Sequence, residues 1–219
     1  MVNTVGTTKG MSHDTPRTRL EPADRRRDLL EVAETLAHAD GIDGLTARGV
    51  AHHARASKAL IFHYFGSVVG LQRAVAASAV HDLLTATQPH DDLPPADRTR
   101  AILDAFITAV TARREVWTDI WGGALRADPE TQVILARARA VLVDRMASGV
   151  ARRSLGDTSG HIALLSLGWV ALAENITAAW LAGGTLTQDE LLDLLIGSLT
   201  AILGSDPATS AAPRTTTTA

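Results

Sequence analysis

One segment, residues 46–65, restricts the fold more than any other part of this 219-residue chain. Its sequence is TARGVAHHARASKALIFHYF. Apolar residues recur at helical spacing on both sides of a short polar break, and Thr46 and Ser57 are each suited to cap a following helix. Small Ala51 and Ala54 would let two such helices approach closely. The segment therefore predicts two short helices joined by a tight turn, which is a helix-turn-helix.

The second of these helices is expected to present a polar and aromatic face to solvent. In a helix-turn-helix this face enters the DNA major groove. Lys58 can donate to guanine acceptors and Ala59 can contact a thymine methyl group. Phe62 and His63 lie beside them on the first two turns of the helix. We infer sequence-specific binding of double-stranded DNA.

Some of these assignments have structural alternatives. Thr46 and Ser57 lie at helix N-termini, where N–H groups and hydroxyls favour phosphate oxygens, but both could be helix caps only. Phe62 could belong to the core. The pair His52-His53 suggests a metal site, yet adjacent helical residues point about 100° apart and no ligand triad surrounds them. We predict no metal site and no cofactor.

The rest of the chain also predicts helices, so the predicted fold class is all-α. The chain has no cysteine, which excludes disulfides and thiolate zinc sites, and its aromatic content is only 4%. The stretch 88–96, with three prolines, breaks the helical pattern. Caps and apolar periodicity predict helices over 24–40, after Thr46, Ser57 and Ser67, around 102–110 and 117–125, from Pro129 onward, and over 159–182 and 188–203.

Composition and charge divide the chain into four parts. Residues 1–21 and 205–219 are rich in small and polar residues and are expected to be disordered tails. Residues 22–70 would form the DNA-binding domain and 71–204 a second helical domain. Residues 1–81 carry 10 Lys+Arg against 8 Asp+Glu, and the remainder carries 11 against 16. This asymmetry suits a protein that offers one end to phosphates. The first two dozen residues lack an apolar run of signal-peptide length, so we expect a cytoplasmic protein.

The last two predicted helices are apolar nearly all round. Residues 162–181 contain a single charge, Glu174, and their length fits a bilayer crossing. Glu174 and Asn175 in the second half, and the lack of flanking Lys or Arg, favour a buried or dimer-forming helix over a membrane span. We predict that both helices pair with their copies in a homodimer as a four-helix bundle. The alternative is that both are interior helices of a monomer.

The pattern around the helix-turn-helix resembles the TetR family of transcriptional regulators. The resemblance runs from about Arg27 to Leu71 and rests on one set of spaced residues: Leu45, Thr46, Arg48, Val50, Ala51, Ala54, Ser57, Lys58, Leu60, Ile61, Phe62, His63, Tyr64, Phe65, Ser67 and Leu71. It implies that Arg48 reaches a base edge or a phosphate and that the Tyr64 hydroxyl contacts the DNA backbone. It also implies a palindromic operator and a C-terminal domain, residues 71–204, for effector binding and dimerisation.

The chain departs from the family pattern at two positions. The turn between the two helices usually has Gly where this chain has Arg55. If Arg55 is left-handed, it adds about 1–2 kcal/mol of strain. The following helix usually carries a Lys near its start where this chain has Val68, and losing one phosphate contact would weaken binding and flatten its salt dependence.

The resemblance further implies that a small molecule bound in the C-terminal domain releases the DNA. Candidates for a largely apolar effector pocket are Phe106, Val110, Trp117, Trp121, Leu142, Met146, Trp169 and Trp180. The alternative for each of them is core packing. Glu174 joins this set because its helical neighbours are apolar, so its charge needs a partner. That partner would be a donor group of the effector or, by slight preference, an arginine such as Arg137 or Arg139.

These observations predict a homodimeric regulator, a repressor that leaves its operator when a small, largely apolar effector binds. The alternative is a helical small-molecule sensor or adaptor that kept the fold and lost operator binding, which Arg55 and Val68 make conceivable. We do not expect an enzyme, because the sequence shows no nucleophile–base pairing, phosphate loop or HExxH spacing.

Overall fold

The computed structural model describes residues 22–90, 92–151 and 159–203, and all secondary structure within these ranges is helical. The predicted disordered tails lie outside the described residues. The elements follow in this order: α1 (Pro22–Asp40), α2 (Ala47–His53), α3 (Lys58–Phe65), α4 (Val68–Ala86), α5 (Pro95–Ala112), α6 (Arg114–Gly122), the 3₁₀ turn η1 (Ala124–Ala127), α7 (Pro129–Ala151), α8 (Ser159–Leu181) and α9 (Gln188–Leu203). The predicted all-α class is confirmed.

Helices α2, α3 and α4 begin where their capping residues predict. The hydroxyl oxygens of Thr46, Ser57 and Ser67 accept hydrogen bonds from backbone N–H groups three residues ahead, over 3.0, 3.2 and 2.9 Å. Each cap satisfies a donor that a helix N-terminus would otherwise leave free. The start of α1 differs from the prediction. It begins at Pro22, which suits the first turn, so Asp24 lies inside that turn and accepts from Arg27 instead of capping the helix.

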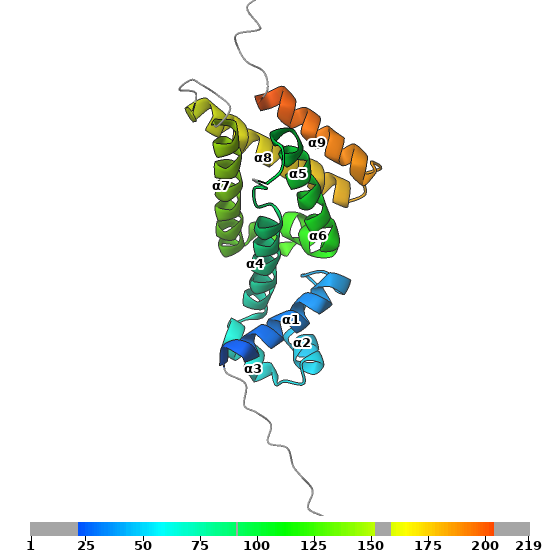
Figure 1. Cartoon of the computed structure of the whole chain (residues 1–219). Coiled ribbons are helices and arrows are strands. Elements are labelled where there is room, and N and C mark those ends of the chain that lie inside the picture. The colour runs from blue at the N-terminus through cyan, green and yellow to red at the C-terminus, as the bar shows by residue number, and fades with distance from the viewer. Residues whose placement is uncertain (1–21, 91, 152–158, 204–219) are drawn as a thin grey trace, which may run out of the picture.

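Helix α4 connects the two ends of the molecule. In Figure 1, α1–α3 form the lower end, α5–α9 form the upper end, and α4 runs between them. Its buried stripe includes Leu71, Val75, Ala79 and Leu83. It packs against α1 and α3 at one end and against α5 and α7 at the other. A displacement of α4 would therefore change the helix packing at both ends of the molecule.

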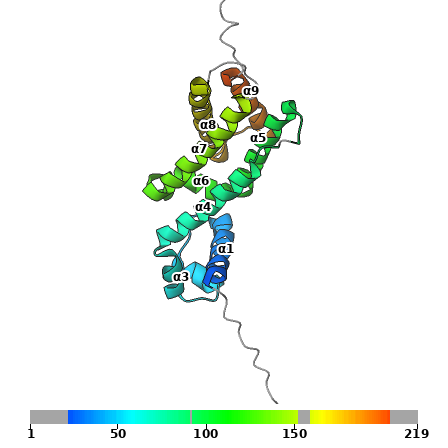
Figure 2. The ribbon, with the colours of Figure 1, turned by 60° about the vertical axis from the view of Figure 1, so that its left-hand side comes forward.

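The C-terminal helices α8 and α9 pack side by side and expose apolar side chains. Figures 1 and 2 place them at the end of the molecule away from α3. A capping box opens α9, since Glu190 accepts from the N–H and hydroxyl of Thr187 and donates its own N–H back. The outer faces carry Leu164, Leu165, Leu167, Leu172 and Leu194, with Leu164 71% exposed. By length and composition, residues 160–181 are apolar enough to cross a membrane, and 28% of the apolar window is buried.

Candidate functional site

The outward face of α3 is built by the packing of its inward face. Buried Val50 and Ala51 of α2 meet buried Ile61 and Phe65 of α3 in one core cluster. Because these residues fix α3 against α2, the opposite face of α3 is turned to solvent. That face consists of four exposed side chains: Lys58, Ala59, Phe62 and His63.

Phe62 lies on the surface rather than in the core. Its side chain is 44% exposed, which excludes the core alternative. An aromatic ring on the surface of a short helix is not needed to pack the core. It can instead make an apolar contact with a thymine methyl group. Tyr64 is half-buried, and its ring lies edge-on to that of His63 at 5.0 Å.

The hydroxyl groups of the capping residues can still form a hydrogen bond to a ligand. Thr46 and Ser57 are exposed, and each hydroxyl oxygen accepts from its own helix. A hydroxyl that accepts can still donate its hydrogen, so capping and phosphate binding are compatible at both positions. Arg48 is exposed on the first turn of α2. The face that the sequence predicted for DNA is therefore assembled on one end of the molecule.

The turn between α2 and α3 contains a strained residue. Arg55 has φ of +48°, the only non-glycine residue with positive φ in the described part of the chain. The backbone closes the turn through Ala56 N, which donates to Ala51 O at 2.8 Å. Val68, where the family usually has Lys, is a half-buried residue in the first turn of α4. The two departures seen in the sequence thus flank α3, Arg55 before the helix and Val68 after it.

The side chains of the histidine pair lie close to each other and to the backbone of α2. The rings of His52 and His53 lie edge-to-face at 5.4 Å, and His53 Nδ1 is 2.9 Å from the carbonyl of Gly49. Across the described residues, no group of three or more His, Cys, Asp or Glu is placed to hold a metal ion.

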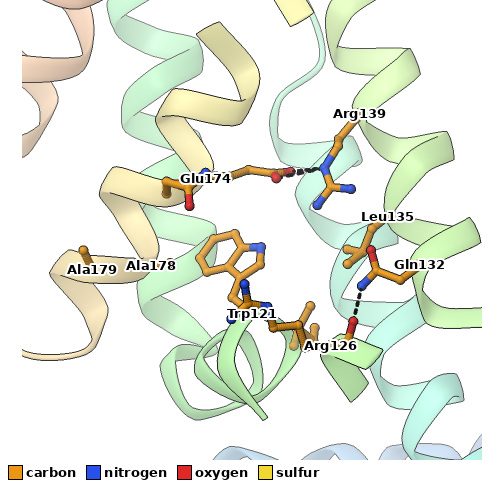
Figure 3. Close-up of a pocket in the computed structure, with 10 residues that line it drawn as sticks. Trp121, Arg126, Gln132, Leu135, Arg139, Glu174, Ala178 and Ala179 are labelled. Atoms are coloured by element: carbon orange, nitrogen blue, oxygen red, sulfur yellow. Dashed lines mark hydrogen bonds and ion pairs between the residues drawn. The ribbon is translucent and has the colours of Figure 1, made fainter. Parts of the chain in front are cut away.

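A second candidate site is a cavity of about 460 Å³ among α6, η1, α7 and α8 (Figure 3). It lies in the upper part of the molecule, apart from α3. The lining is mixed, with apolar, amide and charged side chains: Ile120, Trp121, Arg126, Gln132, Leu135, Arg139, Glu174, Asn175, Ala178 and Ala179.

An ion pair crosses this cavity. Arg139 Nε donates to both carboxylate oxygens of Glu174, at 3.0 and 2.8 Å. This confirms the prediction that an arginine partners Glu174. Burial raises the pKa of Glu174, and the charge and hydrogen bonds of Arg139 only partly oppose that effect. The pair thus consists of two opposite charges that are partly desolvated inside the helical domain.

The other predicted effector residues lie in different places. Trp121 lines the cavity together with Glu174. Four of the candidates are core residues: Phe106, Val110, Trp117 and Trp169. Leu142, Met146 and Trp180 are partly buried and pack against that core.

Sequence reasoning missed three polar residues of the cavity: Arg126, Gln132 and Asn175. Gln132 lies three residues before Leu135 and seven before Arg139 on one face of α7, and this spacing was available in the sequence. Arg126 in η1 carried no periodic signal. Asn175 directly follows Glu174 and could have been considered with it.

The walls of the cavity are bonded to the DNA-binding end of the chain. Asp119, two residues before Trp121, accepts from Asp43 N at 3.1 Å in the loop between α1 and α2. At the start of α7, Asp128 accepts two hydrogen bonds from Arg73 of α4, at 2.8 and 2.7 Å. The Arg73 guanidinium and the N–H of Thr131 hold the pKa of Asp128 well below its usual range. Movement of α6 or α7 would therefore act directly on α4 and on the α1–α2 loop.

Comparison with known proteins identifies the N-terminal part. Residues 29–75 match the family model described as bacterial regulatory proteins of the tetR family. The N-terminal domain of the chain belongs to the TetR family. No curated protein sequence matches it. The helix-turn-helix and its role in transcription regulation thus agree with the resemblance noted in the sequence.

Several solved structures share the fold over most of the chain. A tetR-family transcriptional regulator from Streptomyces coelicolor is 21% identical with a TM-score of 0.76, over 87% of this chain and 85% of that one. A putative TetR-family regulator from Rhodococcus sp. is 20% identical with a TM-score of 0.59, over 83% and 99%. The multidrug binding protein EbrR, complexed with proflavin, is 19% identical with a TM-score of 0.60, over 81% and 99%.

Proposed function

We propose that this TetR-family protein is a repressor that binds a palindromic operator as a homodimer and leaves it when a small molecule enters the cavity. The observation that carries the proposal is the outward face of α3. Four exposed side chains that can contact base edges lie on a helix whose opposite face is fixed in a core. The capping hydroxyls and Arg48 flank that face and would contact phosphates.

The homodimer is supported by the outer faces of α8 and α9. These helices expose five leucines, and a second copy of the same two helices would cover them in a four-helix bundle. Gly168 in α8 and Gly197 in α9 support the same arrangement. A Cβ at either position would meet no atom within 4 Å, so the surface there is open to a second copy. A lipid bilayer is a poorer occupant, since α8 also carries the Glu174–Arg139 pair and packs against α7 and α9.

Release by a small molecule is supported by the position of the cavity. Its walls, α6 and α7, are hydrogen-bonded to the α1–α2 loop and to α4 through Asp119 and Asp128. A ligand that favours one placement of these walls would change the spacing of two recognition helices in a dimer. The similar protein EbrR holds proflavin, which shows that a relative of this fold accommodates a small molecule.

The proposal is tested by titrating the protein against a labelled fragment of its own promoter at physiological salt. Site-specific binding should weaken about tenfold or more in Lys58→Ala, because a side chain on the base-reading face is lost. Arg137→Ala is the matched control, since it removes one exposed positive charge from α7 and should leave binding unchanged. Saturation without preference for any site would contradict the proposal.

A sensor or adaptor that no longer binds an operator is the second candidate. The strained Arg55 and the apolar Val68, which flank α3, favour it. Lys58→Ala and Tyr64→Ala separate the two functions. An adaptor would keep its activity in both variants, whereas a repressor would lose regulation of its promoter.

A further inference from the structure

Two sets of unused hydrogen-bond donors converge in the cavity. Trp121 Nε1 is buried and has no hydrogen-bond partner among the described residues. Arg139 donates to Glu174 through Nε alone. Its two terminal nitrogens have no hydrogen-bond partner among the described residues. In Figure 3 the Trp121 indole and the Arg139 guanidinium point into the same space. A buried donor without an acceptor is costly, which makes these groups a ready site for an acceptor.

The charges of the lining favour an anion. Two arginines, Arg126 and Arg139, face the cavity with one carboxylate, Glu174, so the lining has a positive excess. Glu174 is already satisfied by Arg139. A cationic ligand would have to displace Arg139 from Glu174, whereas an anion can add to the free side of the guanidinium without breaking the pair.

The remaining lining accommodates an apolar body. Ile120, Leu135 and Ala178 line the cavity together with the Trp121 ring, and the volume of about 460 Å³ lies within the range of small-molecule sites. Gln132 is held in place by its Nε2, which donates to the carbonyl of Arg126 at 2.8 Å. A polar end next to Trp121 and Arg139 therefore adjoins an apolar wall.

We propose that the cavity binds a small organic carboxylate, with its carboxylate accepting from Trp121 Nε1 and the terminal nitrogens of Arg139 and its apolar body against Leu135 and Ile120. This inference rests on the proposed function, because it names the chemical class of the effector. It also replaces the largely apolar effector expected from the sequence with a ligand that carries one negative charge.

Calorimetry on the DNA-free protein tests the ligand class with matched probes. The probes are octanoate, 3-phenylpropionate and 2-naphthoate, each beside its neutral amide and the amine of the same carbon skeleton. At least one carboxylate should bind about tenfold or more tightly than its amide, because a charge-assisted hydrogen bond is stronger than a neutral one. If no acid binds more tightly than its amide, or if an amine binds best, the proposal is overturned.

Two conservative variants tie binding to the named groups. Trp121→Phe keeps the ring but removes the N–H, and it should weaken the best carboxylate about fivefold to tenfold with little change for the amide. Trp169→Phe is its control, since that N–H donates to Ser198 away from the cavity. Arg126→Gln should weaken the carboxylate several-fold, and Arg137→Gln, which removes an exposed charge of α7, should not. Equal effects in variants and controls would overturn the assignment.

Ligand class and regulation can fail separately. Preferred binding of a carboxylate that leaves operator affinity unchanged would uphold the ligand class and contradict the proposed release mechanism. Specific operator binding that no probe carboxylate affects, together with no preference for acids in calorimetry, would overturn the ligand class and leave operator recognition intact.

Discussion

The left-handed Arg55 raises the question of what a cationic side chain contributes to a turn that a glycine would form without strain. A non-glycine residue in the left-handed region destabilises the folded state by about 1–2 kcal/mol. Glycine avoids this strain but loses more conformational entropy on folding, which costs about 0.5–1 kcal/mol. Arg55→Gly should therefore be more stable than Arg55→Ala by about 1 kcal/mol, because alanine keeps the strain. Denaturant titration of the two variants measures the difference. Equal midpoints would show that the turn tolerates its backbone conformation without strain.

The Glu174–Arg139 pair makes a pH-dependent contribution to stability. The folded protein raises the pKa of Glu174, so this group favours folding most at low pH, and that contribution is lost as pH rises through the folded pKa. Glu174→Gln should lose less stability than the parent protein between about pH 4 and about pH 7. A loss equal to that of the parent would exclude Glu174 as the source.

The converse variant removes the partner of a buried carboxylate. Arg139→Met leaves Glu174 desolvated without its counter-charge, so it should be destabilised at about pH 7 by about 3 kcal/mol and should recover part of this loss near about pH 4. Denaturant titration at both pH values checks this. Arg137→Met, on the same helix but exposed, is the control and should change little. A pH-independent loss in Arg139→Met would point to packing instead.

At the scale of helices, local chemistry was predictable and long-range contacts were not. The caps at Thr46, Ser57 and Ser67 and the capping box at Thr187 depend on residues three positions apart, so the sequence contains all of their information. The cavity lining depends on which side chains of α6, η1, α7 and α8 face one another. Trp121 and Glu174 were predicted to line it, but Arg126 carries no periodic signal, so it could be assigned to the lining only once the helices were placed.

The contact between α4 and the start of α7 can be tested through its charge. Because the pKa of Asp128 is held low in the folded protein, the stability it contributes is present at neutral pH and is lost as pH falls through the folded pKa. Asp128→Asn should be less stable than the parent at about pH 7, and the difference should shrink near about pH 3. Thermal unfolding at the two pH values measures it. Asp104→Asn, at an exposed position of α5, should show no such difference.

At the scale of the whole molecule, the proposed binding of a palindromic operator would require two copies at a fixed distance. Recognition helices must lie about 34–36 Å apart to enter successive major grooves, and the described residues of one copy contain one such helix, α3. The DNA-binding end and the exposed leucines of α8 and α9 lie at opposite ends of the molecule (Figure 2). Pairing through these leucines would leave both α3 helices free to meet DNA on the same side. The position of the apolar surface is thus compatible with the position of the recognition face.

Leu164→Glu tests that arrangement because it places a charge on the most exposed of these leucines. The variant should sediment as a monomer, since a buried and unpaired carboxylate would oppose association. Its affinity for the full palindrome should fall about a hundredfold or more, toward that of a single half-site, because the second binding event is no longer intramolecular. Val133→Glu adds the same charge to an exposed apolar position of α7 and should remain a dimer with unchanged affinity. A Leu164→Glu protein that is dimeric and binds the palindrome at full affinity would show that two copies meet through another surface.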